Sequence, residues 1–102
     1  MKKSFRDFVQ ALDDAGEMMR VAKPVDMRRL SSLMSQSDKA VMFENIADYP
    51  DWRVAGALIT SRARLAIALD CHSGEIAARF EERAARPIEP EIVGSGPCQE
   101  VV

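Results

Sequence analysis

Residues 40–59 read AVMFENIADYPDWRVAGALI, two apolar segments separated by a polar turn. Residues 40–44 are almost free of polar side chains, and residues 52–59 are longer and mostly apolar, so we predict a strand at each. Pro50 lies between two aspartates and supplies turn chemistry. Gly56, inside the second strand, indicates a bulge or a close approach to its backbone. The two strands are either hairpin neighbours or flank a third strand, and the sequence leaves both arrangements open.

A helix, a strand and a second helix are predicted ahead of this segment. Ser4 and Asp7 resemble a capping box, and the apolar residues that follow have helical spacing, which predicts a helix over residues 4–15. Residues 17–23 alternate in the manner of a strand. Asp26 is placed to cap the second helix. Its apolar positions are Met27, Leu30, Leu33 and Met34.

Two further helices are predicted after residue 59. Ser61 is a cap signal for a helix over residues 62–69, and Ser73 is expected to cap another. The last helix has one apolar face, formed by Ile76, Ala77, Phe80 and Ala84. The fold class is therefore α+β, with a small mixed sheet packed with about four helices and an extended C-terminal arm. We assign residues 1–86 to an N-terminal domain and residues 87–102 to the extended connector.

Composition limits the classes of partner. The chain has 102 residues, which suits one domain, and its 14 basic and 16 acidic residues give a net charge of −2. A nucleic-acid binder would be expected to be strongly basic, so we expect no nucleic-acid partner. Apolar runs are too short for a membrane span. Cys71 and Cys98 are isolated, and with no export signal we expect a cytoplasmic protein without a disulfide.

No catalytic centre follows from the residue types alone. Cys71 and His72 are a nucleophile and a base in sequence, but adjacent residues seldom point at each other, so we interpret them as a loop between helices. The carboxylate pairs are expected on solvated helix faces. Tyr49 and Trp52 could mark a partner contact, although we expect ordinary packing of their rings.

One anion site is a candidate. Ser61, Arg62 and Arg64 stand at the start of a predicted helix, where free backbone N–H groups and two guanidinium groups suit a phosphate or carboxylate. The alternative is a capped helix whose arginines pair with nearby acids. The same three residues are also candidates for interface contacts.

Six segments resemble, in order, motifs of the UbiD-like decarboxylases, and together they span nearly the whole chain. They are FRDFVQAL (5–12), GEMMRV (16–21), PVD (24–26), AVMFENI (40–46), VAGALITSRARLA (54–66) and PCQEVV (97–102). Ala57, Ile59 and Thr60 depart from the pattern, since many members carry Asn, Phe and Gly there. The second-helix region is also shorter than usual. These departures suggest a divergent branch closer to members that act on hydroxylated aromatic acids.

The resemblance implies a reversible, non-oxidative decarboxylation of an aromatic or unsaturated acid. Such enzymes use prenylated FMN with a divalent metal and potassium. The family's Glu–Arg–Glu set, its metal ligands and its flavin phosphate ligands would lie beyond Val102, so no catalytic, cofactor or metal residue is carried onto this chain. We therefore expect the chain to be inactive in isolation.

The tail resembles the opening of the family's cofactor-binding barrel, and its valines favour a strand. Its residues are Cys98, Gln99, Glu100, Val101 and Val102. The chain is thus expected to be a cut or naturally truncated N-terminal domain, with the tail as an arm that docks on the remainder of the decarboxylase. The alternative is a free-standing, non-catalytic small subunit that docks on a separate catalytic chain. An unpaired arm would also favour homo-oligomers through strand pairing.

Overall fold

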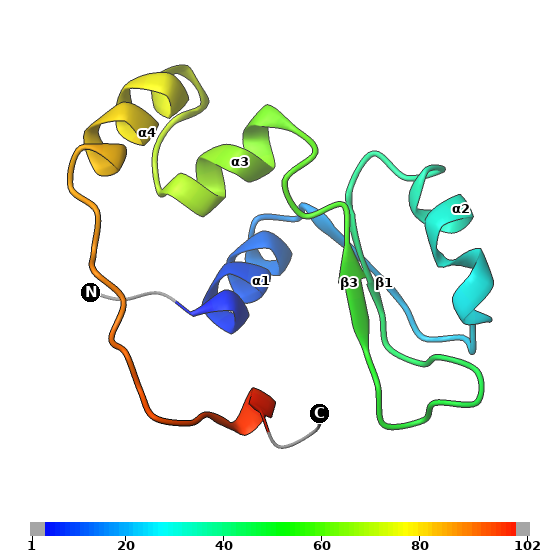
Figure 1. The fold of residues 1–102 in the computed structure, drawn as a ribbon. Coiled ribbons are helices and arrows are strands. Elements are labelled where there is room, and N and C mark those ends of the chain that lie inside the picture. The colour runs from blue at the N-terminus through cyan, green and yellow to red at the C-terminus, as the bar shows by residue number, and fades with distance from the viewer. Residues whose placement is uncertain (1–3, 100–102) are drawn as a thin grey trace.

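The computed structural model describes residues 4–99 and shows the expected α+β class (Figure 1). The described elements follow in the order α1 (Phe5–Asp14), β1 (Met18–Val21), α2 (Leu30–Met34), β2 (Ala40–Phe43), β3 (Val54–Gly56), α3 (Arg62–Leu69) and α4 (Ile76–Ala84). A 3-10 turn at Met27–Arg29 precedes α2, and another at Ser73–Glu75 precedes α4. A third, Pro97–Gln99, lies near the end of the C-terminal arm. None of the helices in residues 4–99 is long and apolar enough to cross a membrane.

The three strands form one mixed sheet in the order β1-β2-β3. β1 and β2 are parallel, with Met18 opposite Ala40, and β2 and β3 are antiparallel, with Val41 opposite Gly56. The two central segments of the sequence are thus hairpin neighbours. Because parallel neighbours need a crossover connection, the chain between β1 and β2 passes through α2 on one face of the sheet.

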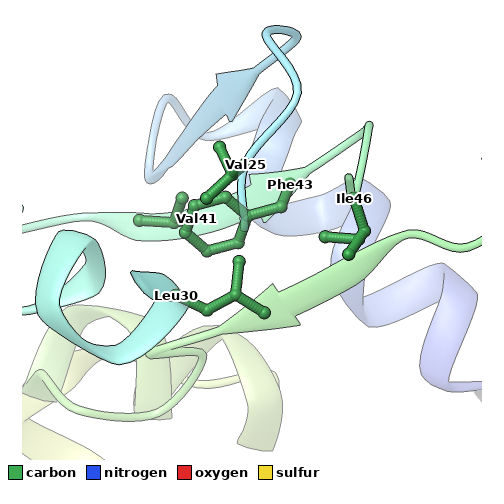
Figure 2. Packing of buried hydrophobic residues seen from close by; sticks show 5 residues of the cluster. All are labelled: Val25, Leu30, Val41, Phe43 and Ile46. Atoms are coloured by element: carbon green, nitrogen blue, oxygen red, sulfur yellow. The ribbon is translucent and has the colours of Figure 1, made fainter. Parts of the chain in front are cut away.

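The strand β2 is buried on both faces and divides the core into two halves. Val41 and Phe43 pack with Leu30 of α2, together with Val25 and Ile46, and Figure 2 shows these five side chains converging. On the other face the second half of the core joins α1 to the sheet. Its buried residues are Leu12, Met18, Ala40 and Met42.

Local capping chemistry fixes where the first helix begins and ends. The amide N–H of Asp7 donates to Ser4 Oγ at 3.1 Å, and the Ser4 N–H donates to Asp7 Oδ2 at 2.9 Å, which confirms the predicted capping box. After α1, Gly16 has a φ of +73°, in the left-handed region that glycine enters without a steric penalty.

Asp26 caps the 3-10 turn that leads into α2, as predicted, by accepting from the Arg28 N–H at 2.9 Å. The Arg28 side chain also donates to this carboxylate. The side-chain hydrogen bond, followed by the backbone bond, lowers the pKa of Asp26 to about 2.

The predicted strand over residues 52–59 is wrong in extent, because β3 covers only Val54–Gly56. Before it, the Trp52 N–H donates to the Tyr49 carbonyl at 3.1 Å in a turn. After it, Ala57 has a φ of +56°, which turns the chain out of the sheet. The apolar pattern of residues 52–59 therefore predicts a longer strand than the structure contains.

Two smaller predictions also need correction, for Ser73 and for the tail, and the surroundings of α4 add a new observation. Ser73 begins a 3-10 turn capped by His72, so it does not cap α4 directly. The apolar face of α4 is not buried among residues 4–99, and its Phe80 is exposed. Cys98 and Gln99 lie in a 3-10 turn and do not open a strand, while Glu100, Val101 and Val102 lie outside the described residues.

The close approach expected at Gly56 is made by the thioether of Met34, because a Cβ on Gly56 would clash with its sulfur. We predict that Gly56→Ala lowers the free energy of unfolding by about 1–2 kcal/mol. Chemical denaturation measures the change. Gly74→Ala is the matched control, since a Cβ at that position would meet nothing within 4 Å. In a Met34→Ala background the penalty at Gly56 should shrink, and an unchanged penalty would contradict this account.

Ala57 occupies a conformation that asparagine adopts more readily than alanine. We predict that Ala57→Asn raises the free energy of unfolding by about 0.5–1 kcal/mol, because it relieves backbone strain. Ala57→Val should lower it, since a β-branched side chain is disfavoured at positive φ. Urea denaturation of both variants and of the unsubstituted chain measures the three free energies of unfolding. A higher free energy of unfolding for Ala57→Val than for the unsubstituted chain would refute this account.

Candidate functional site

Arg64 is the only charged residue that is buried among residues 4–99, with 3% of its surface exposed. Its Nη1 donates to the Asp38 carbonyl at 2.8 Å and lies 3.5 Å from Glu17 Oε2. Its Nη2 donates to Thr60 Oγ1 at 2.6 Å. These contacts join α3 to the residue before β1 and to the loop before β2.

The three residues of the candidate anion site make separate contacts at the start of α3. Ser61 caps α3, with its Oγ accepting from the Arg64 N–H at 3.2 Å. Arg62 is exposed and donates to the Ser73 carbonyl at 3.3 Å. Protein groups contact both terminal nitrogens of the Arg64 guanidinium. Anion binding or interface contact by Ser61, Arg62 and Arg64 stays a prediction.

Cys71 and His72 lie in the short connection between α3 and the 3-10 turn that begins at Ser73. The His72 N–H donates to Glu75 Oε1 at 3.3 Å. Cys71 and Cys98 are both free thiols. Within residues 4–99 no group of three or more His, Cys, Asp or Glu side chains is placed to hold a metal ion.

A groove of about 870 Å³, which we call the α1–β3 groove, lies beside the first turns of α1 and the start of β3. Its floor comes from one face of the sheet, where the strand register aligns Arg20, Met42 and Ala55. Its walls include Phe5, Arg6, Trp52 and Arg53. Sequence reasoning missed this groove because its residues are scattered over several separate segments.

The three arginines of the groove differ in their partners. Arg20 forms ion pairs at 2.9 Å with Asp13 of α1 and with Glu44 just after β2. The hydrogen bonds to Asp13 and then to Glu44 raise the pKa of the Arg20 guanidinium. Arg6 and Arg53 form no ion pair or side-chain hydrogen bond within residues 4–99.

The aromatic residues of the groove face solvent. Trp52 is 67% exposed and Phe5 is 62% exposed, and the neighbouring Tyr49 is also exposed. The expectation of ordinary packing for Tyr49 and Trp52 is therefore wrong for the described chain. An exposed tryptophan beside unpaired arginines has the composition found at protein interfaces.

The arm carries the remaining predicted contact residues. Residues 87–96 have no helix or strand, as predicted, and Cys98 and Gln99 are exposed at their end. The docking role of these two residues remains a prediction. Glu100, Val101 and Val102, the rest of the predicted contact set, fall outside the described residues.

Comparison with protein families gives one match. Residues 9–84 match the family described as 3-octaprenyl-4-hydroxybenzoate carboxy-lyase N-terminal domain, UbiD_N. No curated protein matches the chain. The matched region runs from α1 to the end of α4, so it includes Arg64 and the sheet face of the α1–β3 groove.

We predict that Arg64→Met lowers the free energy of unfolding by about 2 kcal/mol. The substitution removes the buried guanidinium, and the Asp38 carbonyl and the Thr60 hydroxyl lose the hydrogen bonds that it donates. Arg62→Met is the matched control two residues away, and it should change stability by less than about 0.5 kcal/mol because the side chain is exposed. Thermal and chemical denaturation measure both. Equal stability losses in the two variants would contradict a structural role specific to Arg64.

Proposed function

The chain belongs to the UbiD family through its N-terminal domain, and from this membership we propose that it is the structural, non-catalytic domain of a UbiD-like decarboxylase. The enzyme would carry out reversible, non-oxidative decarboxylation of aromatic or unsaturated carboxylic acids in the cytoplasm. The observation that carries the proposal is the match over residues 9–84 to a domain named for a carboxy-lyase.

The placement of ionisable groups supports a structural role. The two terminal nitrogens of the buried Arg64 guanidinium contact Glu17, Asp38 and Thr60, whereas its Nε is buried without a hydrogen-bond partner among the described residues. With only 3% of its surface exposed, Arg64 serves the packing of the fold. General acid–base catalysis needs a carboxyl or imidazole group held in a pocket that tunes its pKa. Asp26, the acid whose pKa is lowered, serves as a cap and pairs with Arg28.

Within residues 4–99, no group of three or more His, Cys, Asp or Glu side chains could hold the divalent metal. A flavin phosphate needs converging backbone N–H groups or free basic groups in an enclosed site. The glycines near the arm, Gly94 and Gly96, precede a 3-10 turn and not a helix. We propose that prenylated FMN, the divalent metal and potassium belong to the remainder of the decarboxylase.

Within the proposal, residues 1–86 form the domain and residues 87–102 form the connector to the cofactor-binding barrel. The tail from Cys98 to Val102 would dock on that barrel. The rival proposal is a free-standing small subunit, in which the same tail adds a strand to a separate catalytic chain. Reading the coding sequence beyond Val102 separates the two, because an in-frame barrel supports the first and a stop codon beside a larger decarboxylase gene supports the second.

We predict that the purified 102-residue chain releases no carbon dioxide when mixed with prenylated FMN, divalent metal, potassium and an aromatic acid. The physical reason is that, within residues 4–99, the buried ionisable group Arg64 serves the fold and no group of three or more His, Cys, Asp or Glu side chains is placed to hold a metal ion. Carbon dioxide release and flavin fluorescence measure turnover and cofactor binding separately. A complete decarboxylase of the family serves as the positive control, and reproducible turnover by the chain alone would refute the proposal.

A further inference from the structure

The chain exposes far more surface than a compact domain of its mass. Its radius of gyration is 16.5 Å, whereas a compact chain of this length is expected near about 13 Å. Its accessible surface is 8357 Å², against about 5,700 Å² for a folded monomer of the same mass. The excess is larger than the roughly 800 Å² that one partner buries in a standard interface.

Part of this excess is the segment Ile88–Val93, IEPEIV, which we call the acidic arm segment. In extended backbone, successive side chains point to opposite sides. Ile88, Pro90 and Ile92 therefore share one face, which is apolar. Glu89 and Glu91 share the other face with Val93, so that face carries both acidic groups of the segment. Ile88 is 82% exposed and Ile92 is 95% exposed.

The α1–β3 groove complements this segment in both polarity and charge. Phe5 and Trp52 offer exposed apolar surface, and Arg6 and Arg53 have no ion pair with residues 4–99. The acidic arm segment brings two isoleucines and two glutamates that also form no ion pair with the described part of the chain. Two cations in the groove and two anions on the arm, each without an ion pair inside residues 4–99, thus match in number and in sign.

The acidic arm segment does not fill the groove of its own chain. Pro87 and Pro90 fix their own φ angles, and a proline also holds the residue before it in extended backbone. The arm accordingly leaves α4 as an extended segment with its isoleucines in solvent (Figure 1).

We propose that the acidic arm segment of one chain binds in the α1–β3 groove of a second copy, and that two such contacts form a symmetric dimer. Ile88 and Ile92 cover Phe5 and Trp52, while Glu89 and Glu91 pair with Arg6 and Arg53. In the proposed dimer the two copies exchange arms reciprocally, and this reciprocity closes the assembly by twofold symmetry so that it does not propagate into fibres.

The dimer contact depends on the groove and the arm and not on the proposed decarboxylase role. A failure of dimerisation would leave the family membership and the activity test unaffected. Turnover by the isolated chain would in turn leave the dimer contact standing.

Charge reversal provides the test, with all substituted residues exposed on the surface. We expect sedimentation equilibrium to show a concentration-dependent dimer of the 102-residue chain that weakens at high salt. Arg6→Glu/Arg53→Glu changes only the groove, and Glu89→Arg/Glu91→Arg changes only the arm. Each variant alone should dimerise at least about tenfold more weakly, because both contacts become repulsive.

Mixing the two variants is the decisive step. In a mixed dimer the altered groove meets the altered arm, and the native groove meets the native arm, so both contacts become attractive again. We expect the mixture to recover a dimer close in strength to that of the unsubstituted chain. Glu81→Arg/Glu82→Arg is the control with the same change in net charge as the arm variant, placed on α4, and it should leave association unchanged.

Three results would overturn the proposal. An unsubstituted chain that stays monomeric across the concentration series would assign the groove to a different partner. A mixture that recovers no dimer would point to an arm bound within its own chain or to another interface. Equal weakening in the α4 control would show a general charge effect instead of a specific contact.

Discussion

The burial of β2 on both faces is the constraint on which the rest of this fold depends. Ala40 and Met42 pack toward α1, and Val41 and Phe43 pack toward α2, so all four positions of the strand have to be apolar. A strand buried in this way requires a neighbour on each edge and a cover on each face. The parallel partner β1 then makes the α2 crossover necessary, and the antiparallel partner β3 follows β2 through the connection over residues 44–53.

Much of this arrangement could be predicted from the sequence because its signals are local. Ser4 and Ser61 cap their helices through side-chain oxygens a few residues from the amides they accept from, and that chemistry is visible in the spacing alone. The end of β3 could not be predicted in the same way. Ala57 turns the chain through a positive φ although alanine gives no sign of it, while the apolar residues around it continue a strand pattern. The α1–β3 groove was equally hidden, because strand pairing and helix packing bring its residues together from distant segments.

The segment VAGALITSRARLA shows how a motif that identifies a family can consist of structural requirements. Gly56 lets α2 lie against the sheet, since the Met34 thioether occupies the space of a Cβ. Ala57 holds the backbone conformation that ends β3. Arg64 connects α3 to the entrances of β1 and β2 with its guanidinium. Each of these roles is structural, as the proposed function of the domain requires.

The divided core also explains why so much surface faces solvent. A three-stranded sheet with a thin half-core on each face buries few large side chains, and the largest fully buried ones are Phe43, Leu12, Ile46 and Val41. Small domains bury a smaller fraction of their surface than large ones, and so their own cores leave them only marginally stable. Any partner that binds the folded state and not the unfolded chain adds to that stability by mass action. In the proposed dimer the exposed rings of Phe5 and Trp52 would belong to a core that a second polypeptide segment completes, and the stability of the domain would then depend on assembly.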